Sequence, residues 1–208
     1  MEIYSISAEN TSPVIVLTSG LCEKCTKDEL AYLIGCECGH IQNNHCIYYQ
    51  AAPSFGIIMD SEVVNPVTDN GKQLASVMMD WLTLSCVTAD RAGIICLDKP
   101  QEFSNVFISL REKGLNDIYS RTGQTFDRNK AEKMYETLHV TPARSISLDS
   151  STNFLERRYF AGMEFLNCET LYSWRNDIGG ADLHTVNKQA LEVRCEIILG
   201  SDPGKAGV

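Results

Sequence analysis

The sequence has no apolar run long enough to cross a membrane. Its longest runs, Val14–Leu17 and Phe55–Met59, are far shorter than the roughly 20 residues that a spanning helix needs. The start of the chain, Met1–Ser5, lacks the basic residues and the apolar stretch of a signal peptide. Basic residues are few and scattered, 18 against 27 acidic ones, for a net charge of -9. These absences argue against a membrane or nucleic-acid partner, and they predict a cytoplasmic protein.

The composition is that of an ordinary globular protein, with 44% hydrophobic and 22% charged residues in a chain of 208. No internal repeat or linker divides the chain, so we predict a single domain over residues 1–208 and find no signal of an oligomeric state. Cysteine is abundant at nine residues, and the odd number argues against a complete disulfide framework. In a reducing compartment, so many thiols point to metal binding or redox chemistry.

A strand and a capped helix are predicted near the start of the chain. The β-branched run Pro13–Thr18 is typical of a strand. Thr26 and Glu29 have the spacing of a capping box, so a helix should begin near Lys27. Apolar residues keep the helical period from there to about Tyr49.

This predicted helix carries the sequence Cys36-Glu37-Cys38-Gly39-His40, which differs from the zinc-peptidase motif H-E-x-x-H at its first ligand. Cys36 and His40 are four residues apart and therefore share one face of the helix, with Glu37 beside them. Gly35 and Gly39 each cost a helix about 1 kcal/mol, so we expect them to admit a close neighbour.

A second long helix is predicted over about Lys72–Leu97, after a loop from Ala51 to Gly71 that is long enough to pass over a site. Cys86 and Asp90 stand four residues apart on one face of this helix. A thiol and a carboxylate on one face of this helix are side chains that a metal site could use, opposite the helix that carries Cys36 and His40. Taken alone, the pair is better explained as a core cysteine and a salt-bridged aspartate.

Weaker helical patterns fill the rest of the chain. Three further helices are predicted, over Asn105–Leu115, Arg128–Leu138 and Asn153–Phe165. We expect Arg157 and Arg158 on the polar side of the last of these. The final segment, Val186–Leu199, is compatible with either a helix or a strand.

Together these segments resemble the zinc metallopeptidase family that includes the HtpX heat-shock protease and the CAAX prenyl protease, in its short soluble form. The resemblance covers about Pro13–Leu97, and a weaker match follows at His139–Arg144. The matching segments are Val14–Leu21, Asp28–Leu30, Cys36–His40, His45 and Trp81–Leu97, which contains Ala89–Gly93. This resemblance implies an α+β, mostly helical, zincin-like fold with a small sheet and two long metal-binding helices.

The resemblance also implies a metal site with altered ligands. Cys36, His40 and Cys86 occupy the three ligand positions, two of which have become cysteine in place of the family's histidine and glutamate. Chance replacement would seldom produce cysteine twice, so the pair favours an altered site over a lost one. Zinc is the expected metal, and iron or another metal that tolerates thiolates is the alternative.

The same resemblance assigns roles around the metal. Glu37 would act as the general base, and Asp90 would orient His40 through its other ring nitrogen. His139 and Arg144 would stabilise a developing oxyanion. Cys22 and Cys25 form a C-x-x-C pair just before the helix start, so they are possible additional thiols for metal or redox chemistry, or simply structural residues.

Three functions remain open at this point. The first is a metal-dependent hydrolase that acts on a peptide or small amide substrate, which the strand at Val14–Leu17 would hold by backbone pairing. The second is a non-proteolytic metalloenzyme with thiolate ligands, which catalyses a redox or tailoring reaction. The third is an inactive, peptidase-like binding protein.

Overall fold

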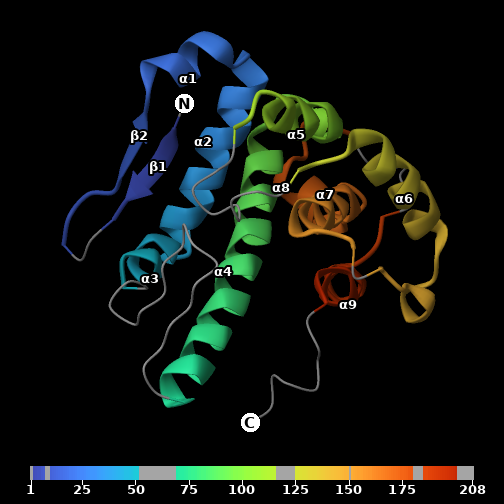
Figure 1. Ribbon diagram of the computed structural model, residues 1–208. Helices are drawn as coiled ribbons and strands as arrows, with labels where there is room; N and C mark the ends of the chain where they lie inside the picture. Colours follow the sequence, from blue (N-terminus) through green and yellow to red (C-terminus); the bar gives the residue numbers. More distant parts are fainter. Residues whose placement is uncertain are drawn as a thin grey trace.

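Helices make up most of the chain, and a two-stranded sheet lies at its amino-terminal end (Figure 1). The computed structural model describes residues 2–7, 10–51, 69–115, 125–149, 151–179 and 185–200. The strands β1 and β2 pair antiparallel, with Ile3 opposite Leu17. The elements are β1 (Ile3–Ile6), β2 (Val14–Leu17), α1 (Ser19–Lys24), α2 (Lys27–Gln42), α3 (His45–Ala51), α4 (Asp69–Cys96), α5 (Phe103–Glu112), α6 (Arg128–Val140), α7 (Phe154–Phe165), α8 (Glu169–Trp174) and α9 (Lys188–Leu199), with short 3₁₀ turns η2 (Pro100–Glu102) and η3 (Ala143–Ser145). The predicted α+β, mostly helical class is confirmed.

Helix α2 begins where the capping box places it and ends earlier than its periodicity suggests. Thr26 Oγ1 accepts a hydrogen bond from the Glu29 amide at 3.2 Å, and Glu29 accepts one from the Thr26 amide at 2.6 Å. The prediction of one helix to about Tyr49 is wrong, because the chain turns after Gln42. The Asn43 side chain donates to the Gly39 carbonyl, and Asn44 adopts the left-handed conformation at φ 57°, which asparagine tolerates well.

Helices α2 and α4 pack closely through small residues. A Cβ atom added at Gly35 would lie 2.9 Å from the Cα of Gly93, and one added at Gly39 would lie 2.8 Å from the Cβ of Ala92. The prediction that these two glycines admit a close neighbour is confirmed. Their cost in helix propensity is offset by the near contact of the two backbones, which fixes how the faces of α2 and α4 meet.

The remaining helices agree with the predicted segments to within a few residues, and the last segment is helix α9. The predicted loop from Ala51 lies mostly outside the described residues, but its last residues, Asp69–Gly71, already belong to α4. The sheet, α2, α4 and α7 follow one another across the molecule (Figure 1). Helices α5 and α7 share an aromatic cluster built around Phe103, Phe107 and Tyr159, which forms the centre of the core.

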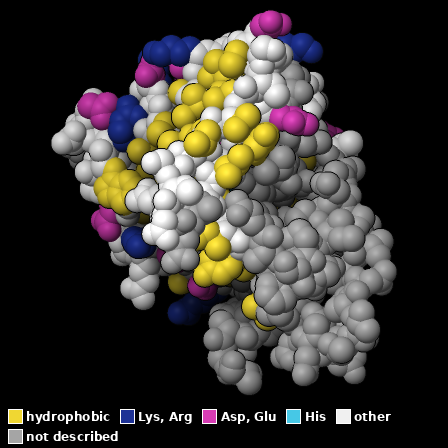
Figure 2. All heavy atoms as spheres, turned by 90° about the vertical axis from the view of Figure 1, so that its left-hand side faces the viewer, with side chains coloured by type: hydrophobic (Ala, Val, Ile, Leu, Met, Phe, Trp, Pro, Cys, Tyr) yellow, Lys and Arg dark blue, Asp and Glu magenta, His cyan; other side chains and the backbone are white. Residues whose placement is uncertain are grey.

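Hydrophobic side chains also gather on the surface that faces the viewer in Figure 2, on the side of the molecule that carries the sheet. Exposed apolar residues on these elements include Ile6 of β1 and Val14 of β2. None of the described helices is both long and apolar enough to span a membrane.

Candidate active site

One face of α2 brings together three of the residues that the sequence singled out. Cys36, Glu37 and His40 line a small enclosed pocket, and Glu37 and His40 are each only 2% exposed. The cavity measures about 10 Å³, which is room for a single water at most. Ile3 of β1 also lines it, so β1 adjoins the pocket, whereas β2, the strand predicted to hold substrate, contributes no lining residue.

Cys86, the predicted third ligand, is not brought into this pocket. It is buried on α4, and the pocket is lined from that helix by Ala89. Within the described ranges, no three histidine, cysteine, aspartate or glutamate side chains are grouped so that they could hold a metal ion. The pocket therefore brings together two of the three predicted ligands, and the assignment of Cys86 as the third stays a prediction.

His40 makes a close contact with a second histidine. Its Nδ1 lies 3.0 Å from Nδ1 of His45, and the two rings meet edge to face. At that distance one ring must donate the proton and the other accept it. Burial lowers the pKa of His45, whose ring also packs edge-on against Trp81. This contact ties the first turn of α3 to the site face of α2.

Asp90 is engaged by groups other than His40. Its carboxylate accepts hydrogen bonds from Nε and Nη2 of Arg158 at 2.9 and 2.7 Å, and from the Tyr32 hydroxyl at 2.7 Å. Burial, and next the charge of Asp90, raise the pKa of Tyr32 well above its usual value, so Tyr32 stays a donor. In this structure Asp90 thus forms an ion pair with Arg158 of α7, and its role in orienting His40 stays a prediction.

Arg158 is the main residue that sequence reasoning misplaced. The expectation that it lies on the polar side of its helix is wrong, since Arg158 is only 2% exposed and lines the pocket of Glu37 together with Arg111 of α5. Its charge is balanced by Asp90 across 68 positions of sequence, which no local pattern reveals. The pocket therefore combines a thiol, an imidazole and a carboxylate with two guanidinium groups.

His139 and Arg144 lie away from the pocket of α2 and line none of it. His139, at the end of α6, contacts the Tyr135 hydroxyl at 3.3 Å and Glu164 at 3.9 Å, and Arg144 is exposed in η3. The reason is that α6 and η3 pack against α7 and α9 rather than against α2. The oxyanion role of these two residues stays a prediction.

Of the C-x-x-C pair, Cys22 lies within α1 and Cys25 caps its carboxyl end, and neither residue lines the pocket. Cys22 is exposed, and Cys25 is half-buried with its pKa raised, first by burial and next by the charge of Glu29. A raised pKa disfavours the reactive thiolate. All nine cysteines are free thiols in this structure.

Comparison with known families settles the relationship of the chain. The family model for peptidase family M48 matches residues 8–111, which include α2 and α4. The chain belongs to peptidase family M48. The resemblance to the HtpX and CAAX-type peptidases is thereby confirmed. No curated protein and no solved structure matches the chain.

Membership of peptidase family M48 indicates a hydrolase of the metallopeptidase type, with peptides as substrates and zinc as the typical metal. The donors at the α2 pocket fit zinc in kind, because thiolate and imidazole are its preferred ligands. Cys36 and His40 supply two donors, and a catalytic zinc site needs three from the protein. The third must come from outside the present lining of the pocket.

Proposed function

We propose that the chain is a metal-dependent hydrolase of the metallopeptidase type that cleaves a peptide or other amide bond at the pocket of α2. One observation carries the proposal: Cys36, Glu37 and His40, which occupy the motif positions of the family, line one pocket between α2 and α4. In this proposal Cys36 and His40 hold zinc, Cys86 completes the ligand set, and Glu37 is the general base.

The chain's own residues supply the proton transfer and the charge stabilisation. A bound zinc ion would polarise the substrate carbonyl and acidify water. Glu37 takes the proton of the attacking water and delivers it to the leaving amine. Arg111, which lines the pocket, stabilises negative charge on the carbonyl oxygen, while Arg158 is held by its ion pair with Asp90. Because the cavity is only about 10 Å³, the side chains around it must move apart to admit substrate.

Metal content tests the ligand assignment. We expect about one zinc per chain after purification and gel filtration, and we expect Cys36→Ala and Cys86→Ala to lose most of it. Each variant has a matched control: Cys38→Ala is an exposed cysteine on the same helix, and Cys168→Ala is a fully buried one elsewhere. Equal zinc content in all four variants would refute the ligand set.

Hydrolysis itself is tested at Glu37. The Glu37→Gln variant should retain its zinc and lose peptide cleavage by about 100-fold or more, because the amide cannot accept the proton from water. Full turnover with bound metal would remove Glu37 from the mechanism.

A second function, peptide binding without catalysis, is favoured by the two arginines in the pocket. A guanidinium group can supply, beside Glu37, the positive charge that a metal ion would otherwise bring. The exposed apolar residues of β1 and β2 would then contact an extended peptide. This function predicts a chain that purifies without metal, shows no zinc-dependent rise in melting temperature and binds peptides that it does not cleave.

A further inference from the structure

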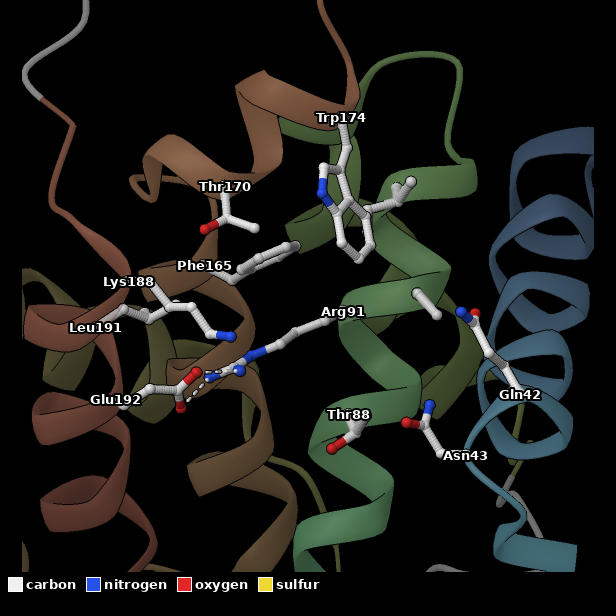
Figure 3. Close-up of a pocket in the computed structure, with 12 residues that line it drawn as sticks. Gln42, Asn43, Thr88, Arg91, Phe165, Thr170, Trp174, Lys188, Leu191 and Glu192 are labelled. Carbon is white, nitrogen blue, oxygen red and sulfur yellow. Dashed lines mark hydrogen bonds and ion pairs between the residues drawn. The ribbon is translucent and has the colours of Figure 1, made fainter.

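A larger cavity lies beside α4 and shares no lining residue with the α2 pocket. It measures about 300 Å³, the lower end of the range of small-molecule sites, and it is enclosed by α4, α8, α9 and the end of α2 (Figure 3). Thr88, Arg91 and Ile95 form its wall on α4. At about 100° per residue Arg91 stands about 200° round α4 from Ala89, which lines the α2 pocket. The two cavities are therefore separate sites.

The floor of this cavity carries an excess of positive charge. Arg91 pairs with Glu192, with Nη1 and Nη2 at 2.8 and 3.1 Å from the two carboxylate oxygens. Lys188 is a second cation in the lining, and it has no ion-pair partner in the described part of the chain. Figure 3 shows its ammonium group pointing into the cavity beside the Arg91–Glu192 pair. Two cations and one anion leave a net charge of about +1 for a ligand to neutralise.

Arg91 also offers a hydrogen bond that nothing in the described structure accepts. Its Nε is buried and has no acceptor among the described residues, although its two terminal nitrogens are used by Glu192. A buried donor without an acceptor is costly, so an oxygen atom that reaches Nε after a small shift of the Arg91 side chain gains more than it would at an exposed donor. The chemistry of the floor thus calls for a single anionic oxygen ligand.

The upper wall of the cavity is aromatic. The guanidinium carbon of Arg91 lies 5.6 Å from the centre of the Phe165 ring, and Trp174 stands at the rim with 66% of its surface exposed. Figure 3 shows both rings on the same side of the cavity, above Arg91. An exposed tryptophan beside an apolar cavity is a surface on which a flat group can stack.

We propose that this cavity binds a small carboxylate that carries an aromatic or other flat apolar group. The carboxylate lies against Lys188 and the Nε of Arg91, and the flat group lies against Trp174 and Phe165. Such a ligand has two sources, a free aromatic acid or the carboxy-terminal aromatic residue of a peptide. The site is independent of the hydrolase proposed above, because it uses none of its residues.

The chain has two tryptophans, so the Trp81→Phe variant leaves Trp174 as the sole tryptophan, whose fluorescence can be excited selectively over that of tyrosine. Titration of this variant with 3-phenylpropionate should give a saturable change in Trp174 fluorescence. The neutral analogue 3-phenylpropionamide should bind at least about tenfold more weakly, because it cannot pair with Lys188. Adding Lys188→Met should weaken binding of the acid by a similar factor. Lys24→Met, an exposed lysine on α1, is the matched control and should leave binding unchanged.

The dipeptide Ala-Phe and its carboxy-terminal amide distinguish the two sources. Tighter binding of Ala-Phe than of 3-phenylpropionate supports the site and assigns it to a peptide terminus, and the reverse supports the site and assigns it to a free acid. A fluorescence change that does not saturate, equal affinity for acid and amide, or full binding by the Lys188→Met variant would each overturn the proposal. None of these results depends on metal content or peptide cleavage.

Discussion

The buried carboxylate of Glu29 should stabilise the fold through its charge, and Glu29→Gln removes that charge with little change of shape. Glu29 is 3% exposed in its side chain and accepts hydrogen bonds of 2.6 Å from Lys113 and Ser109, as well as from the Thr26 amide. Glutamine can still serve in a capping box, so the substitution isolates the interaction with Lys113.

The size of the stability loss in Glu29→Gln follows from how deeply the ion pair with Lys113 is buried. Breaking a fully buried ion pair costs about 3–5 kcal/mol, and the Lys113 side chain is 30% exposed, so we expect a loss of about 2–3 kcal/mol in the free energy of unfolding. Urea unfolding followed by circular dichroism measures it. In a chain of this size the melting temperature should fall by roughly 4–12 °C. The control Glu132→Gln breaks an exposed pair with Arg128 and should cost less than about 1 kcal/mol.

The effect should also depend on pH in a defined direction. Burial raises the pKa of Glu29, but the hydrogen bonds from Lys113, Ser109 and Thr26 outweigh it, and the net shift is below the ordinary value of 4.5. The contribution to stability is therefore fully present above pH 4.5 and is lost as the pH falls through the lowered pKa of the folded state. A difference from wild type of less than about 0.5 kcal/mol at neutral pH, or one that persists undiminished in acid, would refute this reasoning.

Three further predictions concern the core and the thiols. Asp90→Asn removes the charge that pairs with Arg158, and both side chains are buried, at 1% exposure for Asp90 and 3% for Arg158. The substitution should lower the free energy of unfolding by about 3–5 kcal/mol in urea titrations. A change below about 1 kcal/mol would contradict the role of the pair. Gly39→Val should lower the free energy of unfolding by about 1–3 kcal/mol, and with it the melting temperature, because the new Cβ would lie 2.8 Å from the Cβ of Ala92 on α4. An unchanged melting temperature would mean that α2 and α4 are not in close contact. Burial raises the pKa of Cys195 to about 11, whereas Cys22 is exposed. Iodoacetamide at about pH 8 should therefore label Cys22 and leave Cys195 unmodified in the native protein, and peptide mass spectrometry measures the labelling. Equal labelling of the two cysteines would contradict the burial of Cys195.

Features that depend on neighbours in the chain were predictable from the sequence. The capping box of Thr26 and Glu29 located the start of α2 because both partners lie within one turn. Gly35 and Gly39 indicated a close neighbour, since glycine inside a helix is otherwise unfavourable. The motif spacing likewise placed Cys36, Glu37 and His40 on one face, and all three line one pocket.

Features that depend on long-range pairing were not predictable in this way. Arg158 follows a pattern typical of an exposed position, and only its pairing with Asp90 explains its burial. The end of α2 was missed because apolar periodicity continues past it, while the turn depends on the conformation of Asn44. His139 shows the same limit, because a short match to a family motif does not reveal that its helix, α6, packs against α7.

The ion pair between Asp90 and Arg158 has a consequence for how this protein can be divided. The segment that matches the family, residues 8–111, contains Asp90 and ends before Arg158. A fragment with that segment alone would lose the cation that neutralises a buried carboxylate, together with one wall of the α2 pocket. The recognisable half is therefore not a portable module. A chimera that joined residues 8–111 to another carboxy-terminal half would have to supply a new cation or change Asp90.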